Sequence, residues 1–472
     1  MPPFDDVLPR LLPPTFGNVS SGRKGTQIAV LMSGGVDSSV TAMLLRDAGW
    51  DAVGITMKIP VVDACSIRRP CCGTEAALVC KDLGLPHYFV DTDEAFRAFV
   101  IDPFRKSYGE GNTPSPCVDC NTHLKFHLVW DLLRERLGIE HLATGHYARI
   151  DLAQNETRGY PNTAAPVEIA VRATRTVIPA QAGIQETRRS SRRPPLDSRL
   201  RGNDGAGAAS GISGFGIASR LKAEGCRLKE DSSSAAYSLL PTAYSLLRRA
   251  RDSARDQSYF LYGVPRDRLA FLHFPLGGLT KNEVRQAASA CRIFVAGKPD
   301  SMELCFAAQG DYRALLRDMP SRPGPIRDAA GKRLGEHTGL HNFTVGQRRG
   351  LRISNPEPLY VIKLVPEDNA VIVGPRTAGY ETRVRAVHVN VLQPAKLSVG
   401  ESLRGKVRSV GHPEPCVVTG IGTVCQTTTN CEDAFEVTFD PPVFAPAPGQ
   451  HLVLYDADDA IVAGGVISVD KQ

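Results

Sequence analysis

The feature that most constrains this chain is a short turn, Ser33-Gly34-Gly35-Val36-Asp37-Ser38-Ser39, between an apolar run and a helical pattern. The apolar run at residues 27–32 is typical of a buried strand, and residues 40–49 repeat apolar side chains at helical spacing. Two glycines let the backbone approach a phosphate closely, and the start of the helix adds N–H donors. The turn therefore predicts a nucleotide site in an α/β fold.

Polar side chains of this turn extend the prediction. We expect Ser33, Ser38 and Ser39 to donate hydrogen bonds to phosphate, and Asp37 to hold Mg2+ against pyrophosphate. The Lys-Ser/Thr ending of the Walker pattern is missing, so the loop is of another kind. The alternative is a capped helix start without nucleotide, which a lone Ser-Gly-Gly would favour.

Strand and helix patterns continue to alternate after the turn. Strands are expected at 51–58, 87–91 and 141–147, and helices at 74–84, 94–107 and 121–137. This alternation predicts an α/β domain with a parallel sheet and helical crossovers. A further helix is expected from Thr280, which forms a capping box with Glu283. After about residue 309, short β-like runs predict two small β-rich domains, the last a β-barrel.

One segment has a different composition. Residues 151–254 lack a lasting amphipathic period and hold 16 Lys+Arg against 10 Asp+Glu. They account for the whole net charge of +6, because 40 residues of each sign remain outside them. We interpret the segment as a disordered insertion, with a small RNA-binding element as the alternative. RNA contacts must then come from local clusters such as residues 341–352, which hold three Arg and no acid; a solvated loop is the alternative there.

These patterns divide the 472 residues as follows: a flexible leader at 1–26, a catalytic domain at 27–150 plus 255–308, the insertion at 151–254, a central β-rich adaptor domain at 309–379 and a C-terminal β-barrel domain at 380–472. Hydrophobic residues make up 42% of the chain, which excludes a wholly disordered protein. No apolar run approaches the ~18–20 residues of a membrane helix. The N-terminus does not read as a signal peptide. We therefore expect a cytoplasmic enzyme with no membrane partner.

Three of the 12 cysteines stand out, and we expect the cysteines to be reduced thiols. Cys117 and Cys120 form a Cys-x-x-Cys motif before a helix predicted from Asn121, and a helix start stabilises a thiolate. Cys305 follows in the sequence DSMELCF. Zinc would need four ligands, and only two are local. We interpret as buried apolar residues Cys80, Cys226, Cys291, Cys416, Cys425 and Cys431, and leave unassigned Cys65, Cys71 and Cys72.

Eight motifs in order resemble the tRNA-specific 2-thiouridylase (MnmA-type) family of the PP-loop ATP pyrophosphatases. They are SGGVDSS, TPSPCVDCNTHLKF, LATGHYARI, RDQSYFL, FPLGGLTKNEVR, DSMELCF, GLHNFTVGQRRGL and the closing PGQHLVLYD with GGVI. The resemblance covers residues 27–150 and 255–467 and is highly specific, because eight ordered motifs rarely arise by chance. The insertion falls between two motifs that a short loop normally joins.

The resemblance implies ATP-dependent replacement of O2 by sulfur on the wobble uridine of tRNA. It implies that Cys120 is the nucleophile and that Cys305 carries a persulfide, supplied by a sulfur-relay protein or a cysteine desulfurase. It implies ATP contacts from Leu31, Met32, Ser33, Gly34, Gly35, Val36, Asp37, Ser38, Met57 and Gly145. It also implies contacts with the target base or tRNA from Ser115, Pro116, Cys117, Arg255, Asp256, Gln257, Arg408 and Ser409.

The chain departs from the commonest family pattern at Ser115, Cys117, Met302-Glu303 and Ser409. Cys117 stands where many members carry Asp, and this opens a second mechanism. With Cys120 and Cys305, it supplies three thiolates that could hold a [4Fe–4S] cluster, as in related sulfur-transferring enzymes. The persulfide relay remains the leading interpretation.

Two other functions compete with thiolation. One is another PP-loop ligase, such as an enzyme of lysidine or GMP synthesis, which would use an amine rather than sulfur. The other is a catalytically disabled tRNA-binding relative. The intact SGGVDSS loop and the pair Cys120 and Cys305 favour the thiouridylase over both.

Overall fold

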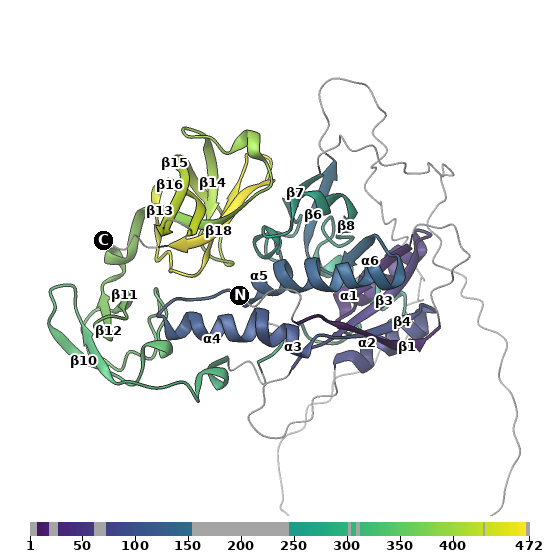
Figure 1. The fold of residues 1–472 in the computed structure, drawn as a ribbon, viewed down its shortest axis with the longest axis horizontal. Helices are drawn as coiled ribbons and strands as arrows, with labels where there is room; N and C mark the ends of the chain where they lie inside the picture. The colour runs from purple at the N-terminus through teal and green to yellow at the C-terminus, as the bar shows by residue number, and fades with distance from the viewer. Residues whose placement is uncertain are drawn as a thin grey trace, which may run out of the picture. The chain divides into compact units, whose positions relative to one another are not determined.

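The computed structural model describes residues 7–17, 27–60, 72–152, 245–300, 304–307, 312–427 and 430–468. Within them lie a six-stranded sheet flanked by helices, a four-stranded sheet, a closed six-stranded barrel and a two-stranded hairpin (Figure 1). The predicted fold class, an α/β domain followed by two β-rich domains, is confirmed. Outside the described residues lie Cys65, Cys71, Cys226, Met302, Glu303 and residues 153–244 of the interpreted insertion, and the side chains of Cys72, Cys425 and Cys431 are likewise not described.

The six-stranded sheet has the order β1-β4-β3-β2-β5-β8. All its strands are parallel except the edge strand β1, which is antiparallel to β4. The strands are β1 (Arg10–Phe16), β2 (Gln27–Leu31), β3 (Asp51–Lys58), β4 (His87–Asp91), β5 (His141–Thr144) and β8 (Leu272–His273). Because the parallel strands end at one edge, the loops that follow β2, β3 and β5 meet there.

Helices cover both faces of this sheet, because neighbouring residues of a strand point to opposite sides. Ile28 and Val30 of β2 share one hydrophobic cluster with α1 (Val36–Asp47), α2 (Cys72–Leu83) and α7 (Lys281–Ala290). Ala29 and Leu31 share the opposite cluster with two continuous helical segments. These are α3–η2–α4 (Asp93–Phe96, Arg97–Ile101, Asp102–Gly109) and α5–η3–α6 (Pro116–Asp119, Cys120–Val129, Trp130–Leu137), in which η2 and η3 are π-helical.

The two β-rich parts have separate hydrophobic clusters. The four-stranded sheet, of order β10-β9-β12-β11, contains β9 (Gly324–Arg327), β10 (Arg333–His337), β11 (Tyr360–Val365) and β12 (Ala370–Gly374). The barrel contains β13 (Tyr380–Val391), β14 (Ser402–Lys406), β15 (Glu414–Thr427), β16 (Asn430–Phe444), β17 (His451–Tyr455) and β18 (Ile461–Ser468). Short 3-10 helices are η4 (Ser258–Leu261), η5 (Arg266–Phe271), η7 (Tyr312–Leu316), η8 (Leu340–Asn342), η9 (Arg376–Gly379) and η10 (Pro394–Lys396).

The start of α7 follows the sequence prediction. The Thr280 side chain accepts a hydrogen bond from the backbone N–H of Glu283, and the Glu283 carboxylate accepts one from the backbone N–H of Thr280. The predicted capping box is therefore confirmed. It fixes the first residue of α7, Lys281, at a defined place.

Two ordered strands lie in segments that we expected to lack structure. Residues Arg10–Phe16 of the expected flexible leader form β1, and residues Ser245–Arg249 of the expected insertion form β7. The expectation is wrong for both strands. β1 pairs with β4, and β7 pairs with β6 (Ala148–Leu152). The sequence patterns of both strands are weak, because β1 contains prolines and β7 ends in arginines. Each strand is therefore stabilised mainly by pairing with its neighbour.

A buried ion pair fastens β7 to the catalytic domain. Nε of Arg249 lies 3.2 Å from Oδ2 of Asp256, and the two residues are 8% and 9% exposed. Oδ1 of Asp256 also accepts hydrogen bonds from the backbone N–H groups of Ala250 and Ser258. Removing Arg249 would leave a buried carboxylate without this counterion, and such a loss is strongly destabilising.

This geometry predicts different outcomes for two deletions. Leu152 and Ser245 are direct register partners, so the chain ends that flank residues 153–244 lie side by side. Replacing residues 153–244 by a short Gly/Ser turn is expected to leave the thermal melt almost unchanged. Deleting residues 157–251 removes β7 with Arg249 and is expected to lower the free energy of unfolding by about 3–5 kcal/mol. Equal melts for the two deletions would contradict this account of the hairpin.

Candidate active site

The phosphate loop connects β2 to α1. Gly34 has a φ of +73°, a left-handed conformation that glycine adopts at little cost. Gly35 is the extended N-cap of α1 and supplies no side-chain hydrogen bond to the first helical turn. N–H groups at a helix start, together with the positive end of the helix dipole, bind phosphate groups in proteins. The loop therefore has the backbone geometry of an anion site.

The serine hydroxyls of the loop bond mostly within it. Oγ of Ser38 accepts from the backbone N–H of Ser33 at 3.2 Å and donates to the carbonyl of Gly35 at 3.2 Å. Oγ of Ser39 donates to the same carbonyl at 2.8 Å, and this residue is 0% exposed. The expectation of a phosphate contact is therefore wrong for Ser39 in this conformation. Ser33 is exposed at the mouth of the loop.

Gly145 follows β5 and closes the loop from the neighbouring strand. A Cβ atom at this position would lie 2.9 Å from the backbone nitrogen of Ser38 and 3.0 Å from the carbonyl carbon of Asp37. Only glycine allows so close an approach of the two backbones. Met57, near the end of β3, is half-buried at the same edge of the sheet. The sheet thus gathers the predicted ATP contacts from β2, β3 and β5.

The Asp37 carboxylate is held by a shared ammonium. Both of its oxygens lie 2.8 Å from Nζ of Lys281, and Oη of Tyr147 donates to Oδ1 at 2.8 Å. The same Nζ lies 2.8 Å from Oδ1 of Asp300. The Lys281 side chain is only 10% exposed. One nearly buried cation therefore serves two carboxylates from distant parts of the chain.

Other cations surround this pair. Asp300 also contacts Arg285 at 2.7 Å and Arg255 at 3.0 Å. Although burial opposes ionisation, the hydrogen bond from Lys281 and the three positive charges lower the pKa of Asp300. Nζ of Lys298 lies 3.2 Å from the carbonyl oxygen of Gly34 and pairs with Glu75. Two lysines therefore stand next to the phosphate loop.

Sequence reasoning missed both lysines and Asp300 as site residues. Lys281 was part of the motif FPLGGLTKNEVR, but nothing in the sequence indicated which group its ammonium would meet. Its position depends on α7 packing against α1, through Val284 and Ala288 in the shared hydrophobic cluster. The available signal was the capping box, which marks Lys281 as the first residue of a helix.

Metal ligands are sparse in the described part of the chain, where no group of three or more His, Cys, Asp or Glu side chains is placed to hold a metal ion. A single carboxylate such as Asp37 is enough for Mg2+ at a nucleotide site, because the ion completes its coordination shell with phosphate oxygens and water. The thiols of Cys117, Cys120 and Cys305 do not form a ready set of ligands for an iron–sulfur cluster in this conformation.

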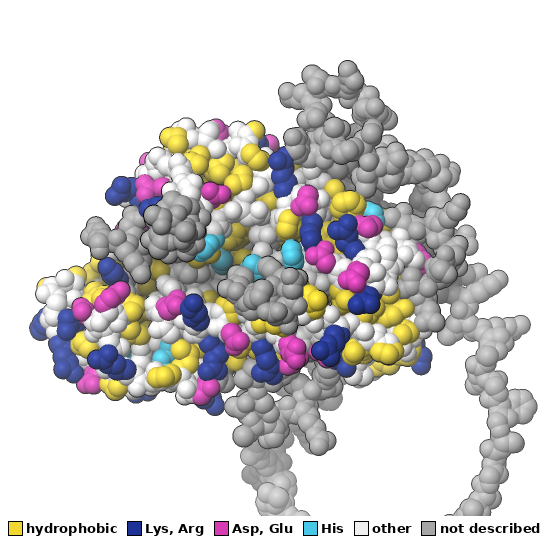
Figure 2. Space-filling view, viewed as in Figure 1, with side chains coloured by type: hydrophobic (Ala, Val, Ile, Leu, Met, Phe, Trp, Pro, Cys, Tyr) yellow, Lys and Arg dark blue, Asp and Glu magenta, His cyan; other side chains and the backbone are white. Residues whose placement is uncertain are grey.

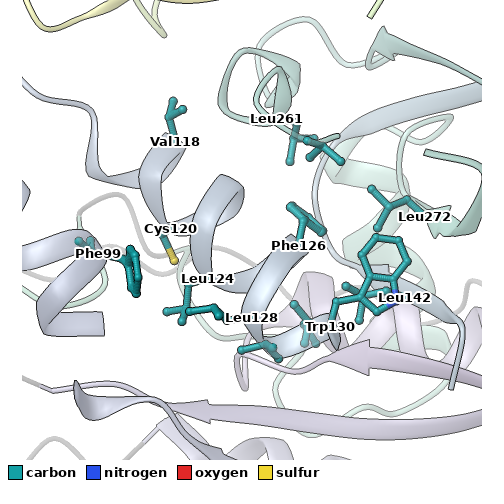
Figure 3. Close-up of a cluster of buried hydrophobic side chains, with 14 of the residues drawn as sticks. Phe99, Val118, Cys120, Leu124, Phe126, Leu128, Trp130, Leu142, Leu261 and Leu272 are labelled. Atoms are coloured by element: carbon teal, nitrogen blue, oxygen red, sulfur yellow. The ribbon is translucent and has the colours of Figure 1, made fainter. Parts of the chain in front are cut away.

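Cys120 lies in the hydrophobic core. The helical segment begins at Pro116, so Cys120 is one turn inside it, where η3 begins. Its side chain is 7% exposed and lies between Phe99 and Leu124 (Figure 3). Burial raises the pKa of its thiol, and the nearby charge of Lys125 opposes this only in part. The expected helix-stabilised thiolate is therefore wrong for this conformation, because burial favours the protonated form of Cys120.

The residues before Cys120 are also largely covered. Ser115, the N-cap of α5, is 8% exposed, and Pro116 is buried. Burial raises the pKa of Cys117 to about 11, although the residue lies in the first helical turn. Burial also raises the pKa of Asp119 to about 7. A ligand would have to uncover this turn before meeting these side chains.

Cys305 has the opposite setting, because it is exposed. Its neighbours anchor it to the core. Phe306 is 2% exposed, with its ring centroid 5.4 Å from that of Phe96, and Leu304 packs against the same hydrophobic cluster that contains Cys120. The two cysteines therefore belong to segments that share one cluster, with one thiol inside it and the other at the surface.

The triplet Arg255-Asp256-Gln257 is engaged within the protein. Arg255 pairs with Asp300, and Asp256 forms the buried pair with Arg249. Oε1 of Gln257 accepts a hydrogen bond from the backbone N–H of Tyr147 at 2.9 Å. The Asp256 side chain is therefore buried in an ion pair within the protein, whereas Arg255 and Gln257 are half-buried.

Arginines gather around one aromatic ring at the end of β16. The guanidinium of the half-buried Arg408 lies 5.7 Å from the Phe444 ring centroid, and that of the exposed Arg376 lies 4.8 Å from it. A Cβ atom on Gly346 would lie 3.0 Å from Ala445, so the loop at 341–352 runs beside the same ring. Exposed arginines of that loop are Arg348, Arg349 and Arg352, and Ser409 is half-buried.

Charge on the rest of the surface is mixed. Figure 2 shows basic and acidic side chains interspersed over the face that it draws. This agrees with the equal numbers of basic and acidic residues outside 151–254. Among the described residues, the helices are all too short or too polar to cross a membrane.

A phosphate loop at the edge of a parallel sheet, followed by two β-rich domains, defines a nucleotide-binding enzyme of the HUP class. Family models agree: the tRNA methyl transferase HUP domain matches residues 26–164 and 235–309, the tRNA methyl transferase PRC-barrel domain matches 313–375, and the aminomethyltransferase beta-barrel domain matches 381–467.

Curated relatives cover nearly the full length. The chain is 36% identical to the tRNA-specific 2-thiouridylase MnmA of Methylorubrum extorquens, over 94% of this chain and 93% of the relative. It is 35% identical to that of Roseiflexus sp. (94% and 100%) and 33% identical to that of Rickettsia conorii (96% and 98%). The chain belongs to the tRNA-specific 2-thiouridylase MnmA family. Among solved structures, one described as a predicted subunit of tRNA methyltransferase from Methanocaldococcus jannaschii is 23% identical over 25% of this chain and 52% of that one, with a TM-score of 0.19.

The contrast between the two cysteines is testable by alkylation. Without tRNA, iodoacetamide at pH 7.5 is expected to modify Cys305 much faster than Cys120, because Cys120 is buried and its raised pKa keeps it protonated. Raising the pH is expected to speed Cys120 modification only above the range in which an ordinary cysteine thiol ionises, because burial raises its pKa. Phe99→Ala should speed Cys120 modification by opening its cover. Peptide mass spectrometry measures both sites, and equal rates in the wild-type protein would contradict this description.

Proposed function

We propose that this protein catalyses ATP-dependent 2-thiolation of the wobble uridine of tRNA. It aligns over nearly the full length of relatives that are named tRNA-specific 2-thiouridylases. The observation that carries the proposal is the pairing, in one domain, of a phosphate loop with the buried thiol of Cys120 and the exposed thiol of Cys305. An ATP ligase that used an amine would not need these thiols.

In the first step, O2 of uridine attacks the α-phosphorus of ATP and displaces pyrophosphate, which leaves O2 bonded to AMP. The loop residues Leu31 to Ser38, with Met57 and Gly145, would hold ATP. Lys281 and Lys298 would neutralise the leaving pyrophosphate, because their ammonium groups already stand beside the loop. Mg2+ would be held by Asp37 together with the phosphate oxygens.

In the second step, sulfur replaces the activated oxygen. Cys305 would carry the persulfide, because an exposed thiol can receive sulfur from a donor protein. The terminal sulfur of this persulfide would attack C2 of the activated uridine, and AMP would depart with O2. The Cys120 thiolate would then attack the Cys305 sulfur, form a disulfide with Cys305 and leave the transferred sulfur on C2. A cellular dithiol would reduce the disulfide. The sulfur donor would be a relay protein or a cysteine desulfurase.

This scheme requires movement around Cys120. A neutral, covered thiol is a poor nucleophile, so the turn at Ser115, Pro116 and Cys117 must open when the target base arrives. Asp119, whose charge acts on the Cys120 thiol, would accept the thiol proton once the turn is open. Binding of tRNA would thereby activate the sulfur chemistry.

We assign the tRNA contacts to three places. The turn at 115–117 would meet the target base, while Arg255 and Gln257 would lie near it. Arg408 and Ser409, together with Arg376 around the Phe444 ring, would contact the phosphate backbone. Arginine side chains suit that role, because their planar groups bind phosphate in a fixed geometry.

A reconstituted assay tests the function. Protein, tRNA, Mg-ATP, a dithiol reductant and a desulfurase with cysteine are expected to give AMP, pyrophosphate and one 2-thiouridine per tRNA. Asp37→Asn is expected to slow AMP formation about a hundredfold, since it removes the carboxylate of the phosphate site. Asp47→Asn, at the other end of α1, is the matched control and should retain activity. Normal AMP formation by Asp37→Asn with an unchanged melt would contradict the ATP site.

Cys117→Asp separates the two sulfur mechanisms. The persulfide relay needs only Cys120 and Cys305, so this variant should keep most of its activity. A cluster mechanism would lose one of three ligands and most of its activity. Iron and sulfide analysis of anaerobically purified protein completes the test. About four irons per protein together with an inactive Cys117→Asp variant would overturn the relay.

A further inference from the structure

We propose that Gln450 is a positioning residue that holds the start of the Cys120 helix in place and thereby keeps the Cys120 thiol buried. The helix start, residues 113–117, belongs to the catalytic domain, whereas Gln450 lies in the barrel loop that joins β16 to β17. The inference deepens the proposed function, which requires this helix start to open before Cys120 reacts. Gln450 is part of the closing motif PGQHLVLYD, but no sequence pattern gave it a role.

Three consecutive residues of the barrel loop contact the backbone of the helix start. Nε2 of Gln450 donates to the carbonyl oxygens of Thr113 at 3.0 Å and of Pro114 at 3.1 Å. The carbonyl oxygen of Pro448 accepts a hydrogen bond from the backbone N–H of Thr113 at 2.7 Å. A Cβ atom on Gly449 would lie 3.0 Å from that same backbone nitrogen. The barrel loop therefore binds the helix start through three hydrogen bonds and a close backbone approach.

Gln450 is itself fixed in the barrel. Its carbonyl oxygen accepts a hydrogen bond from the backbone N–H of Ile467 at 2.6 Å, and the N–H of Gly449 donates to the carbonyl oxygen of Ile467 at 3.0 Å. Ile467 is buried in the hydrophobic cluster of the barrel. Next to Gln450, the backbone N–H and carbonyl oxygen of His451 both bond to Oη of Tyr259, at 3.1 and 3.0 Å. The Gln450 amide is therefore presented from a well-anchored backbone.

The helix start leads directly to Cys120. α5 is only four residues long and continues into η3 at Cys120 (Figure 3). The backbone N–H of Val118 donates to the carbonyl oxygen of Ser115 at 2.9 Å, which closes the first turn. Helices lose their hydrogen bonds from the ends inward, where fewest bonds hold each residue. Displacing the helix start would therefore unwind α5 toward Cys120.

The residue after Cys120 is anchored separately. Nδ2 of Asn121 donates to the carbonyl oxygen of Phe260 at 2.9 Å, and its Oδ1 accepts from Nζ of Lys125 at 3.0 Å. Asn121 is 1% exposed. Cys120 thus lies between a start held by the barrel and a residue held within the catalytic domain. When the Gln450 contact is lost, opening begins at the helix start, because Asn121 keeps its own partners.

The buried conformation of the helix start carries a cost. Thr113 is 8% exposed, and its hydroxyl oxygen has no hydrogen-bond partner among the described residues. A buried hydroxyl without a partner is less favourable than one in water. Release of the helix start would hydrate this hydroxyl, and the hydrogen bonds from Gln450 oppose that release.

The test compares rates of Cys120 alkylation by iodoacetamide in the full chain, without ATP or tRNA. Gln450→Met keeps the side-chain length but removes both donors, and it should speed Cys120 modification by about tenfold or more, as expected for two lost hydrogen bonds. Asn390→Leu is the matched control. Nδ2 of Asn390 also donates from the barrel to two carbonyl oxygens of the catalytic domain, those of Tyr262 and Val264. This control should leave the Cys120 rate near that of the wild type.

Two further variants separate positioning from loss of folding. Gln450→Lys, which keeps N–H donors on a side chain of similar length, should restore part of the slow rate. Gln450→Glu replaces the donor nitrogen by an oxygen that the two carbonyls repel, so it should react as fast as Gln450→Met, with a melt near that of the wild type. A Cys120 rate in Gln450→Met and Gln450→Glu equal to the wild-type rate, or an equal increase in Asn390→Leu, overturns the proposal.

The alkylation result is independent of catalysis, because the assay contains neither ATP nor tRNA. A wild-type chain that thiolates tRNA, together with an unchanged Cys120 rate in both Gln450 variants, would overturn the role of Gln450 and leave the proposed function intact. Faster Cys120 modification in those variants would support the role of Gln450 even if the wild-type chain formed no 2-thiouridine, a result that would contradict the proposed function alone.

Discussion

The ammonium of Lys281 lies between the carboxylates of Asp37 and Asp300, which are far apart in the sequence of the catalytic domain. The geometry of the site depends on this arrangement. Asp37 follows the first strand of the parallel core, Lys281 begins α7, and Asp300 follows the turn after that helix. Two acids on one nearly buried cation would be unstable alone, and Arg285 and Arg255 supply the missing positive charge. The network therefore fixes the loop, the start of α7 and the turn at Asp300 together.

The phosphate loop lies at the edge of the sheet, whereas the Cys120 thiol is buried in the hydrophobic core. At the loop, no side chain of the described residues caps the first N–H groups of α1, and an anion would find free donors there. Cys120, in contrast, lies under Phe99 within the hydrophobic cluster, where a neutral thiol is stable and a thiolate is not. In the proposed mechanism, such a site would keep the Cys120 thiol from solvent until the substrate opens it. The exposed Cys305 can meanwhile meet a donor.

Local patterns predicted much of the fold, and long-range contacts account for what they missed. The strand–loop–helix around Gly34 and the capping box at Thr280 were predictable, because each is specified by adjacent residues. β1 and β7 were not, since their order comes from pairing with β4 and β6. The same limit applies to the site: the motif suggested Asp37 as a metal ligand, but only the packing of α7 shows that Lys281 holds it.

The central claim is that this chain thiolates the wobble uridine of tRNA. Its most direct test is mass spectrometry of wobble nucleosides from cells lacking the chromosomal copy of this protein. We predict that 2-thiouridine derivatives disappear, that the wild-type chain restores them, and that a Cys305→Ser chain does not, although it is present at the same level. Unchanged 2-thiouridine in the cells that lack the protein, or full restoration by Cys305→Ser, would contradict the account.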